Sequence, residues 1–151
     1  MISDLTRDVL TLIARIVVGV TFIAHGLLKI EDVSGAIAGF GKAGIPLPSL
    51  SYWFTILVEL GGGAAMIIGA ALPLIGVLFA VVTLGALVFV HGAQGFYVHE
   101  QGYEFVLVLA VTSLALSVAG DRFALDAALA RRSPAWARLT GRTRRSPVSV
   151  A

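Results

Sequence analysis

The fold is decided by residues 53–90, which read WFTILVELGGGAAMIIGAALPLIGVLFAVVTLGALVFV and contain a single charged residue, Glu59. One helix of this length would measure about 57 Å, almost twice the roughly 30 Å hydrocarbon core of a bilayer. The stretch must therefore fold back on itself. Pro73 marks the expected turn, because proline has no N–H for an unbroken helix. The stretch thus predicts two membrane-spanning helices, at about 52–71 and 74–91.

Two further apolar stretches flank this hairpin. One covers residues 9–28 and is interrupted only by Arg15 and His25, and the other covers 103–119 and begins beside Glu104. The apolar runs are continuous and do not alternate with period two, so they predict helices and not barrel strands. The expected fold is all-α: an integral membrane four-helix bundle.

The composition agrees with a membrane protein. The 151 residues are 58% hydrophobic and 13% charged, with a mean hydropathy of +0.93. A soluble domain carries about 25% charged residues. The chain has no cysteine, which excludes a disulfide framework, a thiolate metal site and dithiol exchange by this chain itself.

The charges are distributed unevenly along the chain. Residues 122–151 hold seven arginines against Asp126, a net charge of +6, whereas residues 1–121 hold four Lys or Arg against eight Asp or Glu, a net charge of −4. The positive-inside rule therefore places the N- and C-termini in the cytoplasm. We expect a multi-pass protein of the cell inner (plasma) membrane, with a transmembrane domain over 1–121 and a basic cytoplasmic tail over 122–151.

The tail has the composition of a membrane-surface element. Residues 124–130 and Trp136 predict an interfacial helix, followed by a disordered basic end that favours anionic lipid headgroups. Orientation and contact with the lipid bilayer account for the arginines, so we expect no nucleic acid partner.

Six ionisable residues lie in or beside the predicted spans. A charge at mid-bilayer costs about 2.5–3.5 kcal/mol, so these residues need partners. Helical periodicity places Arg15, His25 and Lys29 on one stripe of the first span, which must face the bundle interior. The topology brings five groups into the outer half and leaves Arg15 alone in the inner half. The predicted polar, cofactor-binding pocket comprises Arg15, His25, Lys29, Glu59, His91 and Glu104, with no catalytic residue assigned.

The order and spacing of these residues resemble the DoxX family of small four-helix membrane proteins. The resemblance rests on Arg15-x3-Gly19-x2-Phe22-x2-His25-Gly26-x2-Lys29, Gly44-Ile-Pro-Leu-Pro48, Glu59-Leu-Gly-Gly, a later Gly69, and Gly102-Tyr-Glu104 leading to Gly120-x5-Asp126. The family takes its name from a subunit of an archaeal thiosulfate:quinone oxidoreductase. The resemblance therefore implies a membrane partner in redox chemistry, a redox enzyme as protein partner and quinone as the cofactor.

The polar residues allow more than one interpretation. Lys29, Glu59 and Glu104 predict either a quinone or anion pocket, in which Lys29 binds an oxygen and a carboxylate relays protons, or a buried ion pair that sets helix register. Three roles are open for His25 and His91: they bind a haem, they carry protons, or they cap the ends of helices by bonding carbonyl oxygens.

Two other patterns bear on binding and assembly. His99 and Glu100 lie in the connection between the third and fourth spans, where a solvated loop is expected and no metal site. The small residues Gly61, Ala65 and Gly69 predict close helix packing, within one chain or across a homo-oligomer.

Three functions follow from these observations. The first is an accessory or quinone-interacting subunit of a membrane-associated oxidoreductase system, which is not catalytic alone. The second is a non-catalytic membrane scaffold or chaperone-like protein, whose charges only specify the bundle. The third is a small transporter, which four short helices and an inner half lined only by Arg15 make the least favoured.

Overall fold

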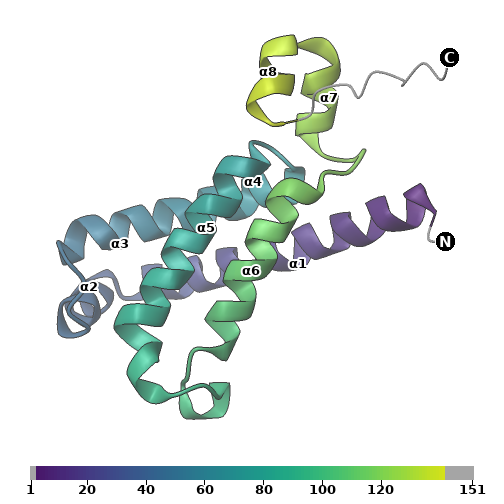
Figure 1. Cartoon of the computed structure of the whole chain (residues 1–151). Coiled ribbons are helices and arrows are strands. Elements are labelled where there is room, and N and C mark those ends of the chain that lie inside the picture. Colours follow the sequence, from purple (N-terminus) through teal and green to yellow (C-terminus); the bar gives the residue numbers. More distant parts are fainter. Residues whose placement is uncertain (1–2, 142–151) are drawn as a thin grey trace, which may run out of the picture.

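The computed structural model describes residues 3–141, and these residues form helices and turns without any strand (Figure 1). Three helical runs are long and apolar enough to cross a membrane: α1 (Asp4–Glu31), the run Pro48–Ile68 and the run Leu72–Gln94. The shorter helix α6 (Glu104–Ala119) is also apolar. The chain is therefore an all-helical, multi-pass membrane protein, as its sequence predicts.

Both runs of the central hairpin contain a π-helical segment. In such a segment one extra residue is inserted into a turn, and π-helical turns are frequent at functional sites. Glu59 lies in the first segment and His91 in the second. The elements of the hairpin are α3 (Pro48–Ile56), η1 (Leu57–Gly62), α4 (Gly63–Ile68), α5 (Leu72–Ala86), η2 (Leu87–His91) and η3 (Gly92–Gln94).

The hairpin turns before Pro73 and not at it. Helix α4 ends at Gly69, and Ala71 follows; their φ angles of 75° and 50° are both in the left-handed region. Glycine adopts this conformation without a steric penalty and commonly ends helices. Pro73 instead lies in the first turn of α5, where a missing N–H leaves no helical hydrogen bond unmade.

The connection expected over residues 32–49 contains a helix, α2 (Val33–Lys42). Asp32 begins it, because its carboxylate accepts a hydrogen bond from the Gly35 N–H at 2.9 Å. This bond and a second one from the Ser34 hydroxyl hold the pKa of Asp32 below its usual value. This helix was not predicted, because the glycines of the segment favoured a loop and the N-cap at Asp32 was given less weight.

The helices meet through glycines and a stacked aromatic pair. Helices α5 and α6 lie side by side, and α1 crosses behind them against α4 and η1 (Figure 1). A Cβ on Gly19 would lie 2.7 Å from the Gly63 carbonyl oxygen, so the two backbones are in direct contact. The rings of Phe22 and Phe79 stack with centroids 3.5 Å apart. The buried core comprises Val18, Phe22, Val58, Met66, Leu72, Ile75, Phe79, Leu116 and Ala124.

The predicted row of small residues mediates close packing only in part in the described chain. Ala65 packs against the buried core, and a Cβ on Gly69 would collide with Arg15 Nη1 of α1. A Cβ on Gly61 would meet only Leu57 of its own helical run. The close crossing with Gly19 uses the neighbouring glycine, Gly63, because that face of the helix is turned toward α1.

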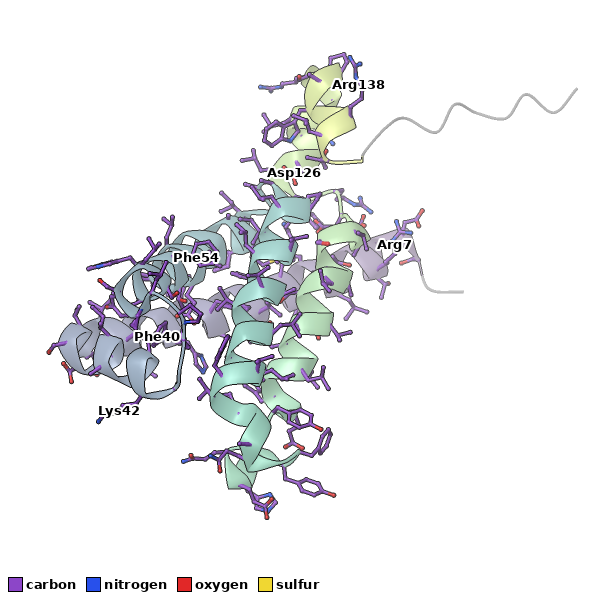
Figure 2. All side chains as sticks on the ribbon, turned by 60° about the vertical axis from the view of Figure 1, so that its left-hand side comes forward. Arg7, Phe40, Lys42, Phe54, Asp126 and Arg138 are labelled. Carbon is purple, nitrogen blue, oxygen red and sulfur yellow. The ribbon has the colours of Figure 1, made fainter. Side chains whose placement is uncertain are left out.

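The described chain ends in two short helices, α7 (Leu125–Arg132) and α8 (Pro134–Leu139), which extend beyond the hairpin turn (Figures 1 and 2). These two helices correspond to the segment predicted as an interfacial helix. The predicted basic end from residue 142 lies outside the described residues. The buried Asp126 carboxylate accepts hydrogen bonds from the Ala71 and Leu72 N–H groups, both at 2.8 Å, and from Trp136 Nε1 at 3.1 Å. Asp126 thus caps α5 and fastens the tail to the turn.

Replacing Asp126 should therefore destabilise the whole chain. In Asp126→Asn the side chain keeps a single acceptor oxygen, which leaves a buried N–H without a partner and costs about 1–3 kcal/mol. We expect a lower melting temperature of the purified protein in detergent. The control Asp4→Asn changes another first-turn carboxylate, whose side chain is 84% exposed, and should leave the melting temperature unchanged. Equal melting of Asp126→Asn and the wild type would contradict the cap.

Candidate functional site

A lysine and a glutamate from two different helical runs form an ion pair in the half of the chain predicted to be outer. Lys29 Nζ lies 2.8 Å from both Glu59 Oε1 and Glu59 Oε2, and 3.3 Å from the His25 carbonyl oxygen. The side chain of Glu59 is 6% exposed and that of Lys29 is 25% exposed. The three ammonium hydrogens of Lys29 thus have three acceptors, and the pair is electrically neutral.

Local features of α1 and η1 bring the pair together. Gly26 lies one helical turn before Lys29, and a Cβ there would be 2.7 Å from Leu60 Cδ2 and 3.2 Å from Glu59 Cβ. Only glycine lets η1 approach α1 this closely. The buried Tyr52 donates a hydrogen bond from its hydroxyl to the Lys29 carbonyl oxygen at 3.2 Å, which holds the end of α1 against α3.

His25 lies beside this pair with one ring nitrogen committed. Its Nδ1 is 2.9 Å from the Thr21 carbonyl oxygen, so Nδ1 carries the proton and donates. The ring is stacked on Phe105 of α6, with centroids 6.0 Å apart and planes 24° apart. Because His25 is exposed, its Nε2 remains for a partner outside the chain. The carbonyl bond corresponds to the capping interpretation, and it leaves proton transfer open.

His91 and Glu104 do not join the Lys29–Glu59 pair through any direct bond that the structure gives. His91 Nδ1 lies 2.6 Å from the Gln101 carbonyl oxygen, and Glu104 Oε1 accepts a hydrogen bond from the Val98 N–H at 3.0 Å. Both side chains therefore hold the connection between η2 and α6. The five predicted outer residues thus divide into two neighbouring groups.

Arg15 is not alone in the inner half, which corrects the expectation from the sequence. Its Nε lies 3.1 Å from Asp121 Oδ2, and its Nη2 donates to Asp121 Oδ1 at 3.4 Å. Both side chains are fully buried. Asp121 was not predicted as the partner of Arg15, because Asp121 follows the last apolar span. The sequence did contain an indication of this pair. Asp121 is an acidic residue at the predicted inner end of a span, at the same predicted depth as Arg15, which needed a partner.

The inner ion pair is enclosed by the hairpin turn and the start of α1. A Cβ on Gly69 would collide with Arg15 Nη1 and would come 2.6 Å from Ala124. One residue after Asp121, Arg122 Nε lies 2.8 Å from Asp8 Oδ2, which joins the start of α1 to the same connection. A buried pair of this kind fixes which segments meet more than it adds net stability.

Two hollows lie near these groups, one at each end. The outer hollow, of about 340 Å³, is lined by η2, the following connection and the start of α6, including His91 and Phe105. The inner hollow, of about 420 Å³, is lined by polar residues including Asp8 and Arg122. Lys29 and Glu59 line neither hollow. Over residues 3–141 no three His, Asp or Glu side chains are grouped as metal ligands.

Removing one partner of the inner pair should be strongly destabilising. In Asp121→Asn the Arg15 charge stays buried without its counter-ion, which costs about 3–5 kcal/mol. We expect a large loss of melting temperature and of folded yield. The double variant Arg15→Met with Asp121→Leu should recover most of the loss, because neither charge remains. Wild-type melting of Asp121→Asn would show that the pair does not hold α1 to this connection.

Comparisons with known proteins agree with this architecture. The DoxX family profile matches residues 10–92, more than half of the chain. The chain is 38% identical over 117 residues to the protein named "Putative oxidoreductase CatD" from Bacillus subtilis (strain 168). The aligned segment covers 77% of this chain and 84% of that relative. It is 33% identical over 85 residues to "Inner membrane protein YphA" from Escherichia coli (strain K12), covering 56% of this chain and 61% of that relative. No solved structure matches the chain. The chain therefore belongs to the DoxX family.

Proposed function

We propose that this DoxX protein is an accessory, quinone-interacting membrane subunit of an oxidoreductase system. The observation that carries the proposal is the Lys29–Glu59 ion pair within apolar helices, with the exposed imidazole of His25 beside it. Ionisable side chains at this depth are rare in membrane proteins and mark binding sites or proton paths. A relative whose printed name describes an oxidoreductase supports the same class of function.

The arrangement in the bilayer is part of the proposal. We place four spans in the cell inner membrane, with α6 as the fourth, because its 16 residues measure about 24 Å and are apolar. The arginines of α7 and α8 support a cytoplasmic position for these two helices under the positive-inside rule. Asp126 ties these helices to the hairpin turn, which is then cytoplasmic as well. An even number of spans puts the N-terminus on the same side.

The side chains of the outer group fit a quinone headgroup at His25. The hydrogens of Lys29 are already directed at Glu59 and at the His25 carbonyl oxygen, so the space between Lys29 and Glu59 is closed. His25 Nε2 is the polar atom that remains, and Phe105 presents an aromatic ring beside it. An imidazole nitrogen bonds a carbonyl oxygen when protonated and accepts from a hydroxyl when neutral.

The chemistry follows from these roles. A bound quinone takes up two electrons and two protons when it is reduced to a quinol. The chain has no cysteine to carry electrons, so a partner redox enzyme delivers them from its own reduced cofactor. His25 holds or releases a proton at Nε2 while Nδ1 stays bonded to the Thr21 carbonyl oxygen. Glu59 stays paired with Lys29, and this pair holds η1 against α1 beside His25.

A scaffold role is the second candidate, and one observation favours it. The Lys29–Glu59 pair is complete within the chain and borders neither hollow, as expected for a pair that only sets helix register. The transporter interpretation has less support, because the Arg15–Asp121 pair is fully buried in the inner half.

Substitution of the outer pair separates the two candidates. We expect Lys29→Ala and Glu59→Ala to abolish quinone binding and partner-dependent quinone reduction, because the pair holds η1 against α1 and Lys29 bonds the His25 carbonyl oxygen, so its loss displaces His25. Both quantities are measured in membranes and normalised to folded protein. The matched control Glu31→Ala removes an exposed carboxylate near the same end of α1 and should have no effect. Lower melting temperatures with unchanged normalised activity would support the scaffold role and contradict the quinone site.

His25 provides a sharper test, because its ring can be changed without removing the stacking. In His25→Phe the contact with Phe105 is kept and the Nε2 hydrogen bond is lost, so quinone binding should weaken about 5–10-fold while the melting temperature changes little. Titration of the purified protein with decylubiquinone measures this effect. Binding equal to the wild type would remove His25 from the site.

A further inference from the structure

The inner hollow lies where the end of α6, the start of α1 and the helical tail meet (Figures 1 and 2). The last turn of α6 forms one wall, and Arg7 and Asp8 of α1 form a second. Ala127 of α7 and Thr140, which follows α8, form a third. The volume of about 420 Å³ falls within the roughly 300–1,000 Å³ of small-molecule sites. The hollow therefore has room for a small polar group.

Two links hold the walls of this hollow in place. The Arg15–Asp121 ion pair joins α1 to the connection that follows α6. The Asp126 N–H donates to the Gly69 carbonyl oxygen at 2.9 Å, which ties α7 to the hairpin turn. The hollow is therefore formed before any ligand arrives.

Two guanidinium groups meet at one carboxylate in this hollow. Arg122 Nε donates to Asp8 Oδ2 at 2.8 Å, and Arg7 Nη2 lies 3.8 Å from Asp8 Oδ1. The Asp8 side chain is buried, while those of Arg7 and Arg122 are 64% and 52% exposed. The other carboxylate in the walls, that of Asp121, is paired with the buried Arg15. The side chains that line the hollow thus leave one positive charge in excess.

Both guanidinium groups keep N–H donors for a further anion. A guanidinium has five N–H bonds, and Arg122 uses its Nε on Asp8, which leaves its Nη groups for another acceptor. Arg7 also contacts Asp4 at 3.5 Å, but Asp4 is 84% exposed, and such a surface pair is weak. Neighbouring guanidinium groups suit a phosphate, because its oxygens accept N–H bonds in pairs.

An apolar stripe leads away from the hollow along α6. Val118 lines the hollow and is 82% exposed. Leu114 and Val111, which are also exposed, follow on the same face toward the middle of this apolar helix. A molecule that covers both the hollow and the stripe carries an anionic head and an apolar chain. A soluble phosphate lacks the chain, and a quinone lacks the charge.

We infer that the inner hollow binds the phosphate of an anionic phospholipid between Arg7 and Arg122, with the acyl chains along the stripe of Val111, Leu114 and Val118. The inference goes beyond the proposed function and does not depend on it, because Arg7 is about 27 Å from His25 along α1. A lipid bound there connects the start of α1 with the end of α6 and the tail, and it stabilises the folded chain.

The test uses the full chain in detergent micelles, with phosphatidylglycerol as the probe and native mass spectrometry to count retained lipid. Arg7→Gln removes one exposed guanidinium from the hollow and should weaken lipid binding about 10-fold. The matched control Arg132→Gln removes the same charge from an exposed position of α7 outside the hollow and should bind as the wild type does. Wild-type binding by Arg7→Gln would overturn the inference, and so would equal losses in the two variants.

A second pair of variants tests the hollow itself. Ala119→Trp places a large ring in the hollow from an exposed position and should abolish lipid retention. Ala38→Trp makes the same change at an exposed position of α2 and should have no effect. Phosphatidylglycerol with a photoreactive headgroup should label residues 7–8 or 117–122 of the wild type, which decides the matter if Ala119→Trp does not fold. Labelling confined to other residues would contradict the site.

Competing molecules identify the source of the phosphate. Phosphatidylglycerol should bind about 10-fold more tightly than phosphatidylcholine with the same acyl chains, because the fixed positive charge of choline offsets that of the phosphate. Equal retention of phosphatidylcholine would show that the acyl chains alone are bound. Glycerol phosphate that displaces the lipid at equal concentration would show a site for soluble phosphates. Either result would overturn the assignment to an anionic lipid.

Discussion

A charge in hydrocarbon must have a counter-charge, and this requirement organises the structure around α1. Arg15 and Lys29 are about 21 Å apart along that helix, one toward each side of the membrane. Each meets a carboxylate from another segment: Asp121 after α6, and Glu59 in η1. The two pairs attach α1 to the rest of the chain near its middle and at its C-terminal end, so its position relative to the hairpin and to α6 is set by electrostatics as well as by packing.

The pairs can form only because the backbones come close. Gly19 and Gly63 let α1 and α4 touch, and Gly26 brings η1 within reach of Lys29. This arrangement limits which groups can bind a ligand, because a carboxylate that is paired with an ammonium or guanidinium group is not free to do so. The groups left for chemistry are therefore the imidazoles, each of which keeps one nitrogen beyond its backbone bond. This division separates the residues that hold the bundle from His25, which is assigned to quinone.

Much of this was predictable from local properties. The apolar stretches, the number of ionisable residues that need partners and the helical tail all follow from composition and periodicity, which act within a single segment. The errors arose where a residue had two plausible uses. Pro73 was expected to form the turn but begins α5, and the glycine-rich connection after Asp32 forms α2 because the N-cap outweighs the glycines. Asp121 was overlooked because it lies beyond the apolar span.

The sequence by itself determined that the chain enters a membrane as helices, since a bilayer admits no other use for such long apolar runs. It also determined which residues could not remain without partners. Only the tertiary structure decided the pairings, because several carboxylates lie at similar depths and proximity selects among them. Gly26 brings Glu59 to Lys29, while Glu104 is taken by the Val98 N–H; Asp126 is taken by the N–H groups that begin α5, which leaves Asp121 for Arg15.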